Sequence, residues 1–298
     1  MAISTLNGAG DGLPDHARGL LIALGGVLLV SFDALLVRLA VAPHWDIIFW
    51  RGLLIGATLA GWMLVSGQRL SLPARARDRL LLGMTVFMLS LNTILFVLSV
   101  AHTAAANTVV ILAAAPFFAA LFSWLFLREM MPLRTWVAIV VAVSGVAVVF
   151  GGGVGGGGAS GDLYALILAL CVGAQFTILR CYPLVPRLPL IALSGGVAAL
   201  IAVPFATPFE LSLQTYAVVA VMGVAQMPLA MVLLAVATRY LPSPEVSLCL
   251  LIETVLAPVW VWWALGEAVP ALTLAGGVLI LSTVAVHAWL ALREETQQ

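Results

Sequence analysis

The chain has 298 residues, of which 63% are hydrophobic and 9% are charged, and its formal net charge is zero. Soluble globular domains contain about 45–50% apolar and about 25% charged residues. A fold that faces only water cannot bury this excess of apolar side chains, so part of the surface is expected to face lipid. All 13 basic residues are arginines, and they form no basic face that would suit a nucleic-acid partner. The composition predicts an all-α integral membrane protein surrounded by the lipid bilayer.

Ten apolar segments cross the expected membrane. Residues 1–18 precede them; they are polar and lack the apolar core of a signal peptide, so we expect a disordered cytoplasmic N-terminus. Glycine, proline and charged residues divide the rest of the chain into segments close to the ~20 residues that cross a bilayer as a helix. The predicted transmembrane helices are residues 19–40, 46–66, 79–100, 104–127, 133–150, 162–181, 188–206, 212–237, 244–264 and 271–292.

Arginines between the spans predict the orientation, because basic loops stay on the cytoplasmic side of a membrane. With the N-terminus inside, every arginine except Arg38 and Arg51 falls in a cytoplasmic segment or at its border. These two lie near the outer ends of the first two spans. The opposite loops contain no arginine and carry acids, among them Glu210 and Glu267. We therefore expect a multi-pass protein of the inner (plasma) membrane with both termini in the cytoplasm.

The two parts of the chain share a short sequence pattern. Residues 127–135 read LREMMPLRT and residues 265–273 read LGEAVPALT, so that four of nine positions match at a constant offset of 138 residues. The matched pairs are Leu127 and Leu265, Glu129 and Glu267, Pro132 and Pro270, and Thr135 and Thr273. This pattern predicts an internal repeat.

The glycine-rich stretch 151–161 is expected to be an extracytoplasmic linker between the repeats. It separates a first repeat, residues 19–150, from a second repeat, residues 162–292, and residues 293–298 form a cytoplasmic tail. Each repeat holds five predicted spans, and because five is odd the second repeat inserts upside down. Two inverted five-helix repeats around a central cavity are typical of secondary transporters.

Three segments carry a more specific pattern. They are FWRG (49–52), the stretch from Ala115-Pro116-Phe117 to Leu127-Arg128-Glu129, and the stretch from Ala257-Pro258 to Leu265-Gly266-Glu267. They resemble the drug/metabolite transporter superfamily of EamA type, except that Arg128 stands where that pattern has glycine. The resemblance implies a monomer that opens alternately to each side, without a cofactor or nucleotide hydrolysis. Within the superfamily, the chain is most similar to bacterial exporters of aromatic and other hydrophobic amino acids.

Polar side chains inside the spans are candidates for the substrate site, because a charge in hydrocarbon is costly unless it is paired or faces water. Tyr164, Cys171 and Gln175 share one stripe of the sixth helix. A cavity with a few polar groups among aromatic walls suits an amphiphilic ligand with a zwitterionic head and an apolar tail. The predicted substrate-binding residues are Asp33, Asn92, Tyr164, Gln175, Phe176, Gln226 and Glu253.

Structural roles stay open for several of these residues. Asn92 and Gln226 suit hydrogen bonding between helices as well as they suit ligand contact. Glu253 is compatible with helix packing, with proton coupling or with contact to a substrate amine. For Arg38 and Arg51 we favour a structural or gating ion pair over ligand binding. Arg51 is the better partner for Asp33, because Asp33 and Arg38 are five residues apart rather than three or four.

Prolines and glycines inside the spans predict how the helices bend and pack. Pro116 and Pro258 lie at similar points of the two halves, 142 residues apart, and are predicted hinges. Gly52 and Gly56 form a GxxxG face that favours close helix packing, either within the chain or between two chains.

Alternatives to amino-acid export remain at this stage. Export of other metabolites or drugs is compatible with every feature above. A membrane-embedded enzyme is disfavoured, because the chain has neither an HExxH nor a DDxxD motif and its four histidines are scattered. We therefore expect no catalytic residue, no metal site and no cofactor.

Overall fold

The computed structural model of the chain describes residues 15–67, 75–128, 133–153, 158–181, 187–237, 240 and 243–295. Throughout these residues the regular elements are helices, as predicted. In chain order they are α1 (Asp15–Ser31), α2 (Asp33–Leu39), α3 (His44–Ser66), α4 (Ala76–His102), α5 (Ala105–Leu112), α6 (Ala115–Leu127), α7 (Leu133–Gly153), α8 (Ala159–Cys181), α9 (Arg187–Ala202), η2 (Val203–Phe205), α10 (Leu213–Ala220), η3 (Val221–Gln226), α11 (Met227–Ala237), α12 (Ser243–Leu265) and α13 (Ala271–Glu295).

These helices form ten segments that correspond to the ten predicted spans. Eight are long and apolar enough to cross a membrane, and the ninth and tenth contain the shorter apolar stretches Ile252–Leu265 and Ala271–Val286. Three segments are interrupted. The first breaks at Phe32 between α1 and α2, the fourth breaks between α5 and α6, and the eighth contains the π-helical turn η3. The all-α membrane architecture is therefore confirmed.

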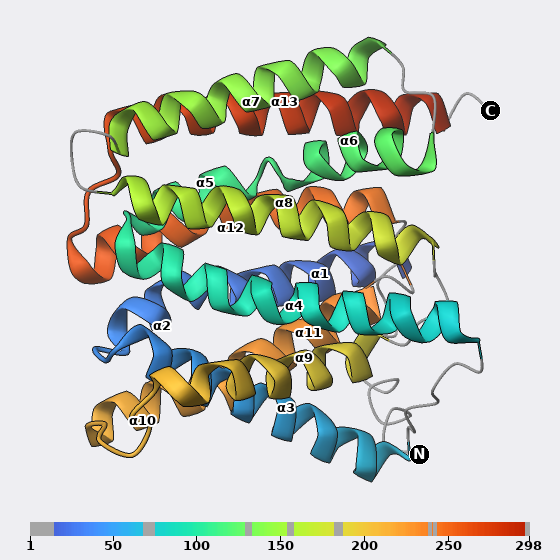
Figure 1. Ribbon diagram of the computed structural model, residues 1–298. Coiled ribbons are helices and arrows are strands. Elements are labelled where there is room, and N and C mark those ends of the chain that lie inside the picture. The colour runs from blue at the N-terminus through green and yellow to red at the C-terminus, as the bar shows by residue number, and fades with distance from the viewer. Residues whose placement is uncertain are drawn as a thin grey trace.

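The segments run between two ends of one bundle (Figure 1). At one end, called here the terminal end, α1 begins and α13 finishes. At the other, called the linker end, α7 ends and α8 begins, and the turns at residues 40–43, 103–104 and 266–270 also lie there. Consequently α1 runs toward the linker end, whereas α8, which opens the second half, runs away from it.

Contacts between the halves follow a twofold pattern. Several segments meet their counterparts five spans later: α3 packs on α9, α7 on α13 and α5 on α12. The other major contacts come in equivalent pairs, one made by each half. The contact of α4 with α8 corresponds to that of α11 with α1, and the contact of α6 with α8 corresponds to that of α12 with α1. Figure 1 shows the α7–α13 pair at one edge of the bundle and the α3–α9 pair toward the opposite edge.

Glycines allow the close approach of the two halves. A Cβ added at Gly52 would lie 2.6 Å from the Gly195 carbonyl oxygen, and one at Gly56 would lie 2.9 Å from the Ala192 carbonyl oxygen. The GxxxG face of the second span thus packs within the chain, against α9. The α7–α13 pair uses the same device, because a Cβ at Gly276 would lie 2.6 Å from the Gly145 carbonyl oxygen.

The two predicted hinge prolines have different surroundings. Pro116 stands in the first turn of α6, directly after the break at residues 113–114. Proline is favoured in a first helical turn, where its missing N–H would have no partner in the helix. Pro258, in contrast, lies inside α12, which continues through it from Ser243 to Leu265.

Candidate functional site

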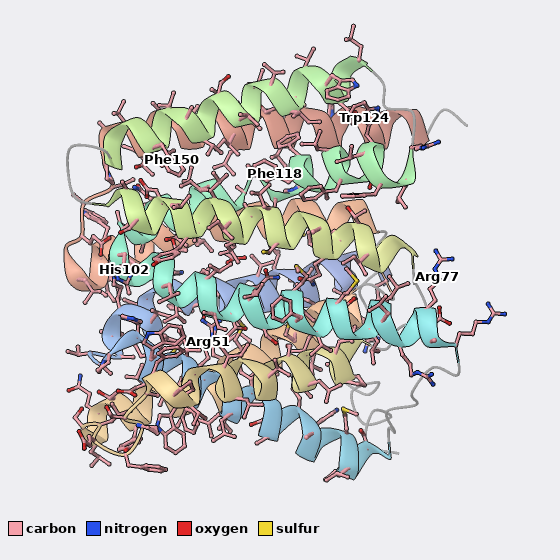
Figure 2. All side chains as sticks on the ribbon, viewed as in Figure 1. Arg51, Arg77, His102, Phe118, Trp124 and Phe150 are labelled. Carbon is pink, nitrogen blue, oxygen red and sulfur yellow. The ribbon has the colours of Figure 1, made fainter. Side chains whose placement is uncertain are left out.

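A buried ion pair joins the first two spans. Arg51 Nη2 donates to Asp33 Oδ2 at 2.7 Å, and the two side chains are only 3% and 4% exposed. Arg51 is therefore the partner of Asp33, as their positions in the sequence predict. Asp33 is seven residues from the linker end of its span and Arg51 is eight residues into α3, so both lie about 10 Å below that end. Figure 2 shows Arg51 inside the bundle.

The pair uses little of its hydrogen-bonding capacity. Arg51 Nε and Nη1 and Asp33 Oδ1 are buried and have no hydrogen-bond partner among the described residues. The Phe96 ring covers the guanidinium, with its centroid 5.4 Å from Arg51 Cζ. Cations are attracted to the face of an aromatic ring, so Phe96 stabilises the charge but leaves the N–H groups in the guanidinium plane unused.

The break at Phe32 places Asp33 at the start of α2, and the second half supports it. Gln226 Nε2 donates to the Leu29 carbonyl oxygen at 2.9 Å, close to where the α1 ladder stops. Trp260 stacks on Phe32 with ring centroids 4.7 Å apart, and its Nε1 donates to Ser31 Oγ at 2.9 Å. Gln226 therefore holds two helices together through this bond, one of the two roles that the sequence leaves open.

Glu253 belongs to the same region. It is partly buried on α12, which packs on both α1 and α2. Its carboxyl group is close enough to that of Asp33 for the two groups to interact electrostatically. The site around the break in the first span thus combines one arginine with two acids.

The other predicted cavity residues lie elsewhere. Asn92 Nδ2 donates to Gln175 Oε1 at 2.6 Å, which links α4 to α8, while Asn92 Oδ1 is buried without a partner among the described residues. Tyr164 contacts the His102 ring edge-on, with centroids 5.7 Å apart, near the linker end. Phe176 is 44% exposed, so it lies on a different face of α8 from the buried Gln175.

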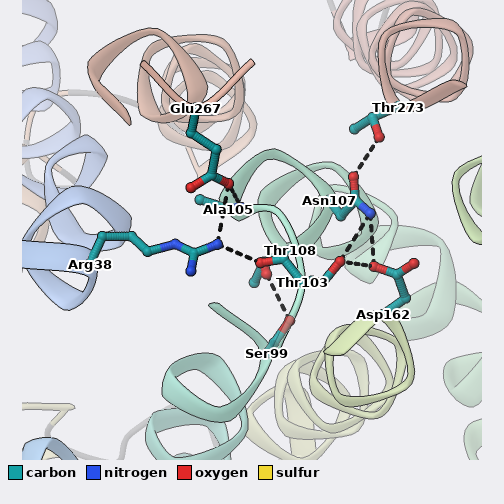
Figure 3. Close-up of polar contacts among 9 residues, drawn as sticks. All are labelled: Arg38, Ser99, Thr103, Ala105, Asn107, Thr108, Asp162, Glu267 and Thr273. Atoms are coloured by element: carbon teal, nitrogen blue, oxygen red, sulfur yellow. Dashed lines mark hydrogen bonds and ion pairs between the residues drawn. The ribbon is translucent and has the colours of Figure 1, made fainter. Parts of the chain in front are cut away.

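At the linker end, a second group of polar side chains ties the two halves together (Figure 3). We call it the linker-end clasp, and its residues are Arg38, Thr103, Asn107, Asp162, Glu267 and Thr273. Arg38 Nη2 donates to Glu267 Oε1 at 3.2 Å and to the Thr103 carbonyl oxygen at 2.7 Å. The Ala105 N–H donates to the same Glu267 oxygen at 2.9 Å. The end of α2 and the start of α5 are thus both bonded to the α12–α13 turn.

Asp162 is the buried centre of the clasp. It is 0% exposed, and its Oδ1 accepts hydrogen bonds from Thr103 Oγ1 at 2.6 Å and from Asn107 Nδ2 at 2.9 Å. Thr273 Oγ1 in turn donates to Asn107 Oδ1. Residues from α5, α8 and α13 therefore share one hydrogen-bonded network, which holds the two halves together at this end.

Part of the clasp was not predicted from the sequence. In the sequence, Asp162 is only an acid near the start of the sixth predicted span, and Thr273 is only a member of the repeated pattern. The sequence feature that could have revealed the clasp is the spacing of Thr103 and Asn107. These two residues are one helical turn apart, and in the structure both bond Asp162 at the start of α8. Among the described residues, no group of three His, Cys, Asp or Glu side chains could hold a metal ion.

Comparison with known proteins agrees with the repeat. The family model of the EamA-like transporter family matches the chain twice, at residues 17–151 and 159–289. A solved crystal structure of a protein superposes with a TM-score of 0.64 at 18% sequence identity, and the alignment covers 93% of this chain and 97% of that chain. This likeness supports the fold alone. No curated protein sequence matches the chain.

Proposed function

We propose that this chain, which belongs to the EamA-like transporter family, exports small metabolites by alternating access, with aromatic and other hydrophobic amino acids as its substrates. The family assignment makes the chain a membrane transporter and not an enzyme. The proposal of alternating access is supported by the pair of family matches, one in each half, together with the twofold contacts between those halves. The direction of transport and the substrate class go beyond the family assignment.

Inverted repeats explain how such a protein can move a solute without a bound energy source. If each half can adopt the conformation of the other, the protein has two states of nearly equal energy that open to opposite sides. The opposite directions of α1 and α8 and the exchangeable helix contacts support this arrangement. Pro116, beside a helix break, and Pro258, inside a long helix, are the proposed hinges.

The linker-end clasp is the proposed gate on one side. It joins α2 to the α12–α13 turn and joins α5 and the residue Thr103 before it to α8 and α13, so these elements have to separate before that end can open. Arg38 and Asp33 lie on the same seven-residue helix, α2. A movement of this segment therefore affects the gate and the buried Arg51 pair together.

The orientation follows from the loops. Among the described residues, the arginines outside the spans lie in segments at the terminal end, and Figure 2 shows Arg77 there. By the positive-inside rule the terminal end is cytoplasmic and the clasp faces outward. We place the protein in the inner membrane, and propose that a substrate enters from the cytoplasm while the clasp is closed.

The proposed substrate site comprises Asp33 and Glu253 near the break in the first span and the Asn92–Gln175 pair between α4 and α8. Gln226 contributes through its support of the break, and Tyr164 and Phe176 are the proposed aromatic contacts. Charged and amide groups near aromatic rings suit a ligand with a polar head and an apolar tail. The export of other metabolites or drugs is the second candidate function, in which a different solute would bind at the same site.

Flux into liposomes tests the proposal. Purified protein is reconstituted into liposomes that are loaded in each case with the unlabelled solute under test (phenylalanine, tryptophan, a sugar or a nucleobase), and uptake of the same radiolabelled solute is measured by counterflow. We expect saturable exchange for the amino acids only. Saturable exchange of a different solute would replace the proposed substrate class, and an absence of exchange for every solute in the panel would refute transport by this chain alone.

A further inference from the structure

The Arg51–Asp33 pair is built differently from the ion pair of Arg38 and Glu267. Arg38 and Glu267 are 26% and 27% exposed and each makes a further hydrogen bond to backbone, whereas Arg51 and Asp33 are 3% and 4% exposed and are joined by one bond. Arginine has five N–H donors. Burial of such a cation with most of its donors unused is strongly unfavourable unless another group binds them.

The atoms without a hydrogen-bond partner among the described residues include donors on a cationic group and an acceptor on an anionic group. Arg51 Nε and Nη1 are donors on a cation, and Asp33 Oδ1 is an acceptor on a carboxylate. Since the two side chains are bonded through their other atoms, the unused donors and acceptor belong to one site. Glu253, on the helix α12 that packs on α1 and α2, adds a second acidic side chain in the same region. A ligand that uses both kinds of atom needs an anionic and a cationic group close together.

We propose that Arg51 and Asp33 bind the head group of a zwitterionic amino acid: Arg51 takes its carboxylate, and Asp33, with Glu253 nearby, takes its ammonium group. The proposal rests on the proposed function and identifies which part of the substrate is recognised. It gives Arg51 a direct binding role in place of the purely structural or gating ion pair that the sequence favours. Phe32, which precedes Asp33 in the chain, stacks on Trp260, and these two rings provide an apolar surface for the side chain of the substrate.

Ligands with only one charge fit this site less well. An amine without a carboxylate would satisfy Asp33 and Glu253 but would leave the Arg51 donors unpaired. A carboxylic acid without an amine would satisfy Arg51, but it would leave the buried Asp33 Oδ1 without a partner and would place another carboxyl group beside two acids. Because an unpaired buried charged group is costly, we expect each single-charge analogue to bind at least about tenfold more weakly than the amino acid.

Competition binding tests this directly. Purified protein is incubated with radiolabelled phenylalanine and increasing concentrations of unlabelled phenylalanine, phenethylamine, 3-phenylpropionate or phenylalanine amide. We expect phenylalanine to compete at least about tenfold better than the three analogues. Equal competition by phenethylamine, or by all four compounds, would overturn the proposal. If phenylalanine does not bind while another solute class shows saturable flux, the head-group proposal is wrong and transport stands; no flux at all refutes the proposed function itself.

Two variants separate binding from structure. In Arg51→Gln we expect phenylalanine and phenethylamine to compete equally, because the carboxylate has lost its partner. In the double variant Asp33→Leu, Arg51→Met both charges are removed together, a change that buried ion pairs often tolerate without loss of fold. We expect this variant to keep its melting temperature within a few degrees and to lose phenylalanine binding by at least about tenfold. Retained binding and counterflow in the double variant would show that the pair is only structural. Arg77→Gln, at an exposed position of the terminal end, is the matched control for loss of an arginine.

Discussion

Close packing of α3 on α9 predicts that Gly52→Ala destabilises the protein. The added Cβ would lie 2.6 Å from the Gly195 carbonyl oxygen and 3.0 Å from the Ala199 nitrogen. Ordinary contact begins at 3.4 Å, so α3 and α9 have to separate by up to 0.8 Å (3.4 − 2.6). Both neighbouring atoms belong to helix backbone and cannot rotate away as a flexible side chain can.

The size of the effect follows from this gap. Overpacking of a well-packed contact costs about 1–3 kcal/mol, which for a large domain corresponds to a fall of roughly 2–12 °C in melting temperature. Gly195→Ala meets the same contact from the opposite side, because its Cβ would lie 2.6 Å from the Gly52 carbonyl oxygen. Once one substitution has separated the helices, the second costs less, so the double variant should lose less stability than the sum of the two single losses.

Melting of the detergent-purified variants, followed by tryptophan fluorescence, measures these changes. Gly61→Ala and Gly83→Ala are the controls, since a Cβ at either position has nothing within 4 Å, and they should melt at the wild-type temperature or a few degrees above it, because alanine is favoured over glycine inside a helix. Size-exclusion chromatography with light scattering should give the same molecular mass for all variants. A melting temperature of Gly52→Ala equal to those of the controls would refute the packing argument. A change in mass confined to Gly52→Ala would instead place the GxxxG face between chains.

Three further predictions concern the linker-end clasp and the orientation. Arg38→Gln removes one partly exposed ion pair, so it should weaken closure of the clasp by no more than about 1 kcal/mol. The rate at which a membrane-impermeant maleimide labels a single cysteine introduced near residue 104 should therefore rise, but less than about fivefold. An unchanged labelling rate would show that Arg38 is not part of the gate. Asp162→Leu leaves Thr103 and Asn107 without their buried acceptor and should lower stability by about 1–3 kcal/mol. Asp162→Asn keeps one acceptor oxygen and should lose less stability. Melting temperatures of both variants equal to that of the wild type would contradict the central place of Asp162. A fluorescent protein fused to the C-terminus should fold and fluoresce in a bacterial host, and a periplasmic phosphatase fused there should be inactive; the opposite pair of results would reverse the orientation.

The break in the first span shows where sequence periodicity stops being informative. Hydropathy predicts one helix over residues 19–40, and the structure instead has α1 and α2 separated at Phe32. No proline or glycine marks the position. The break is held by Gln226 and Trp260, which are 197 and 229 residues away from their partners in the chain. A local pattern cannot contain such contacts, because they exist only once the second half has packed against the first.

The sequence alone determined the membrane class, the ten helical segments, the repeat and the choice of Arg51 as the partner of Asp33. Each of these depends on local properties: apolar length, arginine in short loops, a repeated turn and helical spacing. Only the tertiary structure decided that Glu253 lies near Asp33, that Asn92 bonds Gln175, and that Arg38, Asp162 and Glu267 join a clasp between the halves. These pairings depend on which helix faces which, and that is set by close contacts such as Gly52 on Gly195. The unused donors of Arg51 became visible only when every neighbour within the described structure was in place.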